Sequence, residues 1–179
     1  MTSKISRKSK ETEIELTLRI PGQAEEEKCG SEIRSTAECG SFEKGLRGST
    51  GNGFMDHMLN GLLFYAGFEM ELKMKGDFEI CQHHSFEDLG MVFGKALRAE
   101  LEALGAFSDR GIHRFATKYV PMDESLVRVV LDVGGRSFLR YEMPKLCERI
   151  GTFETETLKE FLRAFSVNGQ LTLHVEGLY

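Results

Sequence analysis

The sequence predicts an α/β fold built from two halves, residues 1–108 and 109–179, that repeat one order of elements. Several segments alternate apolar and polar residues, which is the period of a half-buried strand. Three other segments space their apolar residues three or four apart, which is typical of a helix packed on one face. In each half, strands lead into a helix and then into another strand. Residue identity between the halves is weak, so the repeat is inferred from element order.

In the first half, alternation predicts strands over residues 11–20, 31–38 and 68–75. A glycine-rich turn over 40–53 precedes a helix over 54–67. The residues expected on the core face of that helix are Phe54, Met58, Leu62 and Tyr65. A longer helix over 83–104 follows, with an apolar stripe of Phe86, Leu89, Gly90, Phe93, Ala96, Leu97, Leu101 and Leu104.

In the second half, the pattern predicts strands over 114–120, 126–133, 137–142 and 170–175, with a helix over 154–167. Leu158, Phe161, Leu162 and Phe165 share one face of this helix. His174 shares a strand face with Gln170 and Thr172. The sequence then stops one helix short of the first half. We therefore expect apolar surface on the second sheet to be uncovered.

Composition restricts the possible partners. The formal net charge of -5 leaves no broad basic surface for a phosphate backbone, so nucleic acid is not an expected partner. No apolar run approaches the roughly 18 residues that span a bilayer, and the N-terminus lacks a signal-peptide core. We expect a cytoplasmic protein without a membrane partner. The four cysteines form no CxxC pair, which argues against a zinc ribbon and favours reduced thiols.

The run His83-His84-Ser85-Phe86-Glu87-Asp88 is the strongest chemical signal. On a helix with about 100° of rotation per residue, His83 and Glu87 lie about 40° apart, whereas His84 points about 100° away from His83. This arrangement suits two ions, one bound by His83 and Glu87 and the other by His84. Ligands from elsewhere in the chain or from another subunit would complete each ion. Imidazole and carboxylate donors favour Mn, Fe, Co, Ni or Zn. The alternative is a histidine that fills core and makes one hydrogen bond.

Seven motifs, in order over nearly the whole chain, resemble the imidazoleglycerol-phosphate dehydratase family. They are Lys10-Glu11-Thr12, Thr50 to Leu59 (TGNGFMDHML), His83 to Asp88 (HHSFED), Gly111 to Phe115 (GIHRF), Pro121 to Glu124 (PMDE), Gly135-Arg136 and Thr172-Leu173-His174. The resemblance implies a pseudo-duplicated fold of the ribosomal protein S5 domain 2-like type, with two mixed sheets that each carry helices on one side. It also implies trimers that assemble into a shell of twenty-four subunits.

The same resemblance implies a role for particular residues. The expected metal ligands are His57, His83, His84, Glu87 and His174, which would bind two manganese ions per site at subunit interfaces. Glu11 would contact substrate, Glu11 and Glu87 are the expected catalytic carboxylates, and Arg114 and Arg136 would bind phosphate. The implied reaction, a step of histidine biosynthesis, dehydrates imidazole glycerol phosphate to imidazole acetol phosphate. Metal ions on both ring nitrogens would stabilise an imidazolate.

The sequence departs from the family pattern at several positions. Family members continue beyond the last strand with a second histidine pair, its glutamate and a phosphate-binding lysine, which this sequence lacks. Cys81 replaces an acidic residue, Asn52 an aliphatic residue and Tyr65 a histidine. Two other functions therefore stay open: an inactive metal-binding assembly protein with half of the site, and a generic HHxxE metallohydrolase.

Several site residues also have simpler interpretations. Arg114 and Arg136 could pair with surface acids, and Glu11 could be a solvated strand residue. Asp56 could cap a helix or orient His57. Asp123 and Glu124 could line the site or cap a turn.

Overall fold

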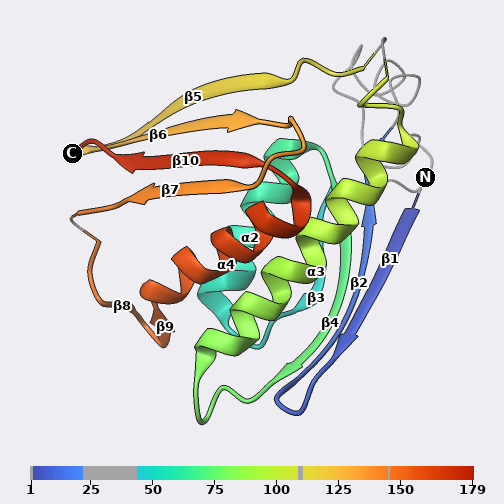
Figure 1. Ribbon diagram of the computed structural model, residues 1–179. Helices are drawn as coiled ribbons and strands as arrows, with labels where there is room; N and C mark the ends of the chain where they lie inside the picture. Colours follow the sequence, from blue (N-terminus) through green and yellow to red (C-terminus); the bar gives the residue numbers. More distant parts are fainter. Residues whose placement is uncertain (1, 22–43, 109–110, 145) are drawn as a thin grey trace, which may run out of the picture.

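The structure is a computed structural model that describes residues 2–21, 44–108, 111–144 and 146–179. One sheet has the strand order β1-β2-β4-β3 and a second has the order β5-β6-β10-β7 (Figure 1). The strands are β1 (Thr2–Lys8), β2 (Thr12–Arg19), β3 (Gly45–Ser49), β4 (Glu69–Gly76), β5 (Phe115–Met122), β6 (Ser125–Asp132), β7 (Phe138–Glu142), β8 (Arg149–Ile150), β9 (Phe153–Glu154) and β10 (Thr172–Gly177). The helices are α2 (Gly53–Ala66), α3 (Gln82–Ala103) and α4 (Glu156–Gly169). This architecture confirms the expected α/β fold with two mixed sheets.

The two sheets also share their pairing register. In the first sheet, β2 is antiparallel to β1 and β4, and β4 is parallel to β3. In the second, β6 and β10 make the same pairings with β5 and β7. Neighbouring strands align Leu18, Met70 and Leu46 in the first sheet and Leu131, Leu173 and Leu139 in the second. The boundary between the halves at residues 108 and 109 stays a prediction.

The helices pack together between the sheets (Figure 1). α3 contacts β1 and β2 on one side and α4 on the other. Glycines make the α3–α4 contact close, because a Cβ on Gly90 would lie 2.3 Å from the carbonyl oxygen of Phe161. A Cβ on Gly94 would lie 2.6 Å from the carbonyl oxygen of Phe165. The core therefore runs from the first sheet through α3 to α4, with Phe86, Leu89, Val92, Phe93 and Ala96 buried along α3.

The core face predicted for α2 is wrong by one residue. Met58, Leu62 and Tyr65 are exposed, and the buried residues are Met55, Leu59 and Leu63. Both sets have helical spacing, because α2 is apolar on more than one face. Packing on β3 and β4 selects the buried face, which periodicity could not.

Some strands also differ from the predictions. β1 was not predicted, and β3 lies in the segment predicted as a turn. Pro121 does not end its strand but lies within β5, which is at the edge of its sheet and tolerates a missing N–H donor. β10 begins at Thr172, since Gln170 is the left-handed residue that ends α4. The strand predicted over 31–38 lies outside the described residues.

The second sheet carries the expected exposed apolar side chains. β5 is exposed at every position. Phe115, Tyr119, Val120 and Met122 contribute to this surface. Among the residues that the structure describes, no helix combines the length and the apolar character that crossing a bilayer would require.

Candidate metal and substrate site

The motif at the start of α3 divides its six residues between two environments. Ser85, Phe86 and Asp88 are buried, whereas His83 and Glu87 are half-buried and His84 is exposed. The buried side rests on the first sheet. Gly76 permits this close approach, because a Cβ there would lie 2.4 Å from Ser85 Oγ. The candidate metal ligands of this motif, His83, His84 and Glu87, are therefore residues that the helix leaves at least partly exposed.

The outward residues form two pairs. His83 Nε2 lies 3.9 Å from Glu87 Oε2, one helical turn away. His84 Nδ1 lies 3.1 Å from Glu11 Oε2, which comes from the residue before β2. The two imidazole rings are 5.4 Å apart with an interplanar angle of 73°. This geometry agrees with the predicted separation of His84 from His83 and Glu87.

Glu87 also faces a cation from the second half. Arg163 on α4 places one guanidinium nitrogen 3.7 Å from Glu87 Oε1 and also pairs with Glu160. The carboxylate of Glu87 is therefore shared between His83 and Arg163.

The β8–β9 segment positions the beginnings of α2 and α3 relative to each other. Asn52 caps α2, since its side-chain oxygen accepts from the N–H groups of Phe54 and Met55, and its Nδ2 donates to Thr152 Oγ1. Gln82 Nε2 donates to the Thr152 carbonyl at 2.6 Å. Sequence reasoning noted Asn52 only as a departure from the family and missed the roles of Gln82 and Thr152.

Phe153 adds an apolar contact at the same place. Its side chain is buried, with its ring 5.0 Å from Phe54 and 5.5 Å from Phe86. It thus fills the space between the first turns of α2 and α3. Its isolated position in the sequence carries no periodic signal that could have identified it.

His57 lies exposed near the start of α2, and Asp56 does not cap this helix. Asn52, not Asp56, is the N-cap of α2. The Asp56 carboxylate instead accepts from the Ser49 hydroxyl and from the N–H and hydroxyl of Thr50. Asp56 therefore fixes the β3–α2 connection that leads to His57.

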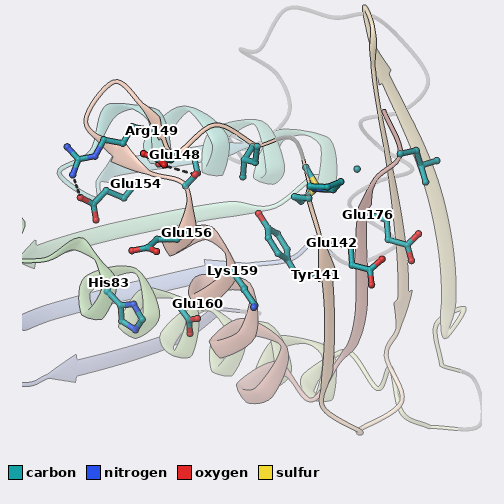
Figure 2. A pocket seen from close by; sticks show the side chains of 16 residues that line it. His83, Tyr141, Glu142, Glu148, Arg149, Glu154, Glu156, Lys159, Glu160 and Glu176 are labelled. Carbon is teal, nitrogen blue, oxygen red and sulfur yellow. Dashed lines mark hydrogen bonds and ion pairs between the residues drawn. The ribbon is translucent and has the colours of Figure 1, made fainter.

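A hollow opens between the start of α3, the β8–β9 segment and the ends of β7 and β10 (Figure 2). His83 points toward it from one side, and Arg149 and Lys159 contribute positive charge. Six carboxylates line it: Glu142, Glu148, Glu154, Glu156, Glu160 and Glu176. Burial raises the pKa of the Tyr141 hydroxyl, which also faces this hollow. This acidic lining disfavours a phosphate group here.

The two candidate phosphate-binding arginines lie in a different region. Arg114 precedes β5 and Arg136 lies between β6 and β7. Arg114 Nε and a second guanidinium nitrogen lie 2.5 and 2.9 Å from the two carboxylate oxygens of Asp132. These hydrogen bonds hold the pKa of Asp132 below its ordinary value, and the charge of Arg136 adds to the effect. The simpler interpretation, pairing with a surface acid, thus describes Arg114 in this structure.

The remaining candidates are far from one another along the fold. Arg114 and Arg98 line the same pocket, and Arg98 lies roughly four turns, or about 22 Å, along α3 from His83. His174 is on β10 in the second sheet, with its ring 5.7 Å from Phe138. Within the described ranges, no three His, Cys, Asp or Glu side chains are grouped closely enough to hold a metal ion. One chain therefore pairs His83 with Glu87 and His84 with Glu11 at the start of α3, and it places Arg114 in a different pocket.

Sequence comparison identifies relatives of the chain. Residues 50–179 match the sequence model of the imidazoleglycerol-phosphate dehydratase family. The chain is 42% identical over 177 residues to the imidazoleglycerol-phosphate dehydratase of Thermoanaerobacter sp. strain X514. The aligned residues cover 99% of this chain and 78% of the relative. It is 42% identical over 175 residues to that of Oceanobacillus iheyensis, covering 98% of this chain and 77% of the relative.

Solved structures give the same result. The crystal structure of imidazoleglycerol-phosphate dehydratase from Staphylococcus aureus subsp. aureus N315 matches with a TM-score of 0.75 and 29% identity, over 99% of this chain and 84% of that one. The enzyme from Pyrococcus furiosus, in complex with (S)-C348, matches with a TM-score of 0.70 and 25% identity, over 97% and 79% of the two chains. On the matched residues, the identity and the shared fold, this chain belongs to the imidazoleglycerol-phosphate dehydratase family, whose members are hydro-lyases.

Proposed function

We propose that this protein removes water from imidazole glycerol phosphate to form imidazole acetol phosphate, a step of histidine biosynthesis. The observation that carries the proposal is the presence of two imidazole–carboxylate pairs at the start of α3, His83 with Glu87 and His84 with Glu11, in a chain of this family. The hydrogen that the substrate must lose is on a carbon beside the imidazole ring and is not acidic. A side-chain base alone would therefore remove it slowly.

Manganese is the proposed cofactor, with two ions per site. His83, His84 and Glu87 fit it chemically, because they supply nitrogen and oxygen donors without thiolate. These three side chains provide part of the coordination shells, and His57 and His174 are the proposed further ligands. Bound Mn²⁺ would supply Lewis acidity toward the ring nitrogens of the substrate.

The chain's own side chains have separate tasks in this proposal. Glu11 is 53% exposed and could exchange protons with the substrate, while Glu87 would serve both as ligand and as catalytic carboxylate. Arg114 and Arg136 would bind the phosphate by charge-assisted hydrogen bonds. For Arg114 to do so, phosphate must compete with Asp132 for the guanidinium group.

We place the complete site between copies of the chain. The substrate is small, yet His83 and the pocket that contains Arg114 are separated by about 22 Å along α3. Arginines from a neighbouring copy would resolve this mismatch. The proposed assembly is a trimer, or the shell of twenty-four subunits that the family resemblance implies.

A second candidate function is an assembly protein that binds metal without turnover. It is favoured by one observation, namely that the described residues of a single chain provide no site with three metal-binding side chains. In that case, metal would join copies of the chain but no substrate would be converted.

One experiment separates the two functions. The protein is depleted of metal, restored with Mn²⁺ and assayed for imidazole acetol phosphate, while its size is followed by light scattering. The dehydratase proposal expects Mn²⁺-dependent turnover that falls at least about 100-fold in His83→Ala and His84→Ala. His113→Ala is the matched control, since His113 is exposed and outside the site. Metal-dependent assembly without turnover would support the second candidate instead.

A further inference from the structure

The buried side of the motif holds a carboxylate that the proposed reaction does not use. Asp88 is 5% exposed, and both of its oxygens have partners. Arg7 Nε on β1 lies 2.7 Å from Asp88 Oδ1, and the hydroxyl of Thr12 at the start of β2 donates to Asp88 Oδ2. Asp88 therefore ties the first turns of α3 to both strands of the β1–β2 hairpin.

Hydrogen bonds continue from Asp88 toward Glu11 in one direction. The single hydroxyl proton of Thr12 goes to the carboxylate, so the Ser9 hydroxyl, 2.9 Å away, must donate to Thr12 Oγ1. Ser9 Oγ then accepts from the backbone N–H groups of Glu11 at 3.2 Å and Thr12 at 3.0 Å. These hydrogen bonds run from the Glu11 amide through Ser9 and Thr12 to Asp88, whose carboxylate oxygen is the final acceptor.

This series of hydrogen bonds reaches the backbone amide of Glu11, the residue that carries the candidate catalytic carboxylate. Glu11 Oε2 lies 3.1 Å from His84 Nδ1, and His84 is one helical turn before Asp88. The same face of α3 thus holds the hairpin through Asp88 and meets Glu11 through His84.

We infer that Asp88 is a positioning residue that, through Thr12 and Ser9, sets the Glu11 carboxylate at hydrogen-bonding distance from His84. The inference rests on the proposed function, in which Glu11 exchanges protons with the substrate. A displacement of such a group by about 1 Å is enough to slow an enzyme about 100-fold.

A second buried carboxylate on α3 provides a matched control. Glu100 is 1% exposed and accepts from the Ser3 hydroxyl at 2.6 Å and from the Ile20 amide at 3.4 Å. It joins the same helix to β1 and to the residue that follows β2, but at the other end of α3 and away from Glu11. Ser3→Ala therefore removes a hydroxyl contact to a buried carboxylate without disturbing the Asp88 chain.

The test compares turnover by the Mn-loaded assembly in two backgrounds. Thr12→Val is expected to lower kcat about tenfold with KM little changed, and Thr12→Ser, which keeps the hydroxyl, is expected to restore it. In a Glu11→Gln background, Thr12→Val should lower kcat almost no further, because the side chain that Thr12 helps to position is no longer a carboxylate. Ser3→Ala should leave kcat unchanged even where the melting temperature falls. An equal loss from Thr12→Val in both backgrounds, or no loss in either, overturns the inference.

Hydrogen exchange gives a reading that does not need turnover. Ser9→Ala alters an exposed residue and leaves the core intact, so it tests the chain even if Thr12→Val fails to fold. The Glu11 amide should exchange faster in Ser9→Ala, whereas the Ile20 amide should not change. Unchanged exchange at Glu11 overturns the inference. A wild-type protein without dehydratase activity would instead refute the proposed function, and the exchange result would still stand.

Discussion

The two sheets of this protein have equivalent strand orders and registers, but helices cover the first sheet more completely than the second. In the first sheet, Leu18 and Met70 are completely buried beneath the helices. At the matching positions of the second sheet, Leu173 is buried whereas Leu131 is half-buried. The strand pairings do not explain this contrast, because they are equivalent. Helix α3 packs on β1 and β2, and the corresponding strands β5 and β6 remain open.

The comparison shows that topology and stability have different sources in this fold. Hydrogen-bonded register is set within each sheet, while burial of apolar side chains depends on which helix covers the sheet. The first sheet and α3 also carry Glu11, His83, His84 and Glu87. The well-packed half thus carries these four candidate site residues, whereas the open half carries His174 and presents apolar side chains to solvent.

The largest expected effect comes from shortening the two matched leucines. Leu18→Ala should lower the free energy of unfolding by about 2–5 kcal/mol, since it leaves a cavity in the core. Leu131→Ala should cost about 1 kcal/mol, because its side chain is already partly in water. Urea unfolding of both variants measures the difference. Equal losses would mean that the second sheet is covered in solution.

Smaller changes in the free energy of unfolding, of opposite sign, are expected when two helical glycines are replaced by alanine. Gly90→Ala should destabilise by about 1–3 kcal/mol, since its methyl group would collide with the Phe161 carbonyl where α3 crosses α4. Gly61→Ala on α2 meets no atom within 4 Å and should stabilise by up to about 1 kcal/mol. Thermal unfolding of the pair tests whether close α3–α4 packing joins the halves. A stabilised Gly90→Ala variant would show that it does not.

The smallest effect concerns an ion pair on the open sheet. Arg19 on β2 and Asp132 on β6 occupy matching positions, so the open sheet has an acid where the covered sheet has a base. Because its pKa is lowered in the folded state, Asp132 stabilises the fold above its unfolded pKa of about 3.9, and this contribution is lost as pH falls through the folded pKa. An NMR titration should show the carboxyl pKa rising toward about 3.9 in Arg114→Gln.

The same titration has an internal control. Arg136 acts on Asp132 through charge alone, whereas Arg114 also donates hydrogen bonds. Arg136→Gln should therefore raise the Asp132 pKa less than Arg114→Gln does. The reverse order would contradict the assignment of Arg114 as the main partner of Asp132.

Sequence patterns identified the helices and strands whose apolar residues recur at a regular spacing. The apolar stripe of α3 and the alternation in β2 and β4 predicted those elements nearly to their ends, because burial on one face imposes a period that the residues themselves display. The spacing of His83, His84 and Glu87 likewise predicted that His83 and Glu87 lie together while His84 points elsewhere, since helical geometry fixes those directions.

Tertiary structure decided what local pattern leaves open. It selected Met55 rather than Met58 for the core, since α2 offers two apolar faces and packing accepts one. It brought Glu11 to His84 and Thr12 to Asp88 across more than seventy residues of sequence. Periodicity describes one element at a time, whereas contacts between elements depend on how the helices and sheets pack together. The sequence by itself therefore determined the elements, the family resemblance and the candidate site residues, and the packing of α3 on the first sheet decided which of those residues meet.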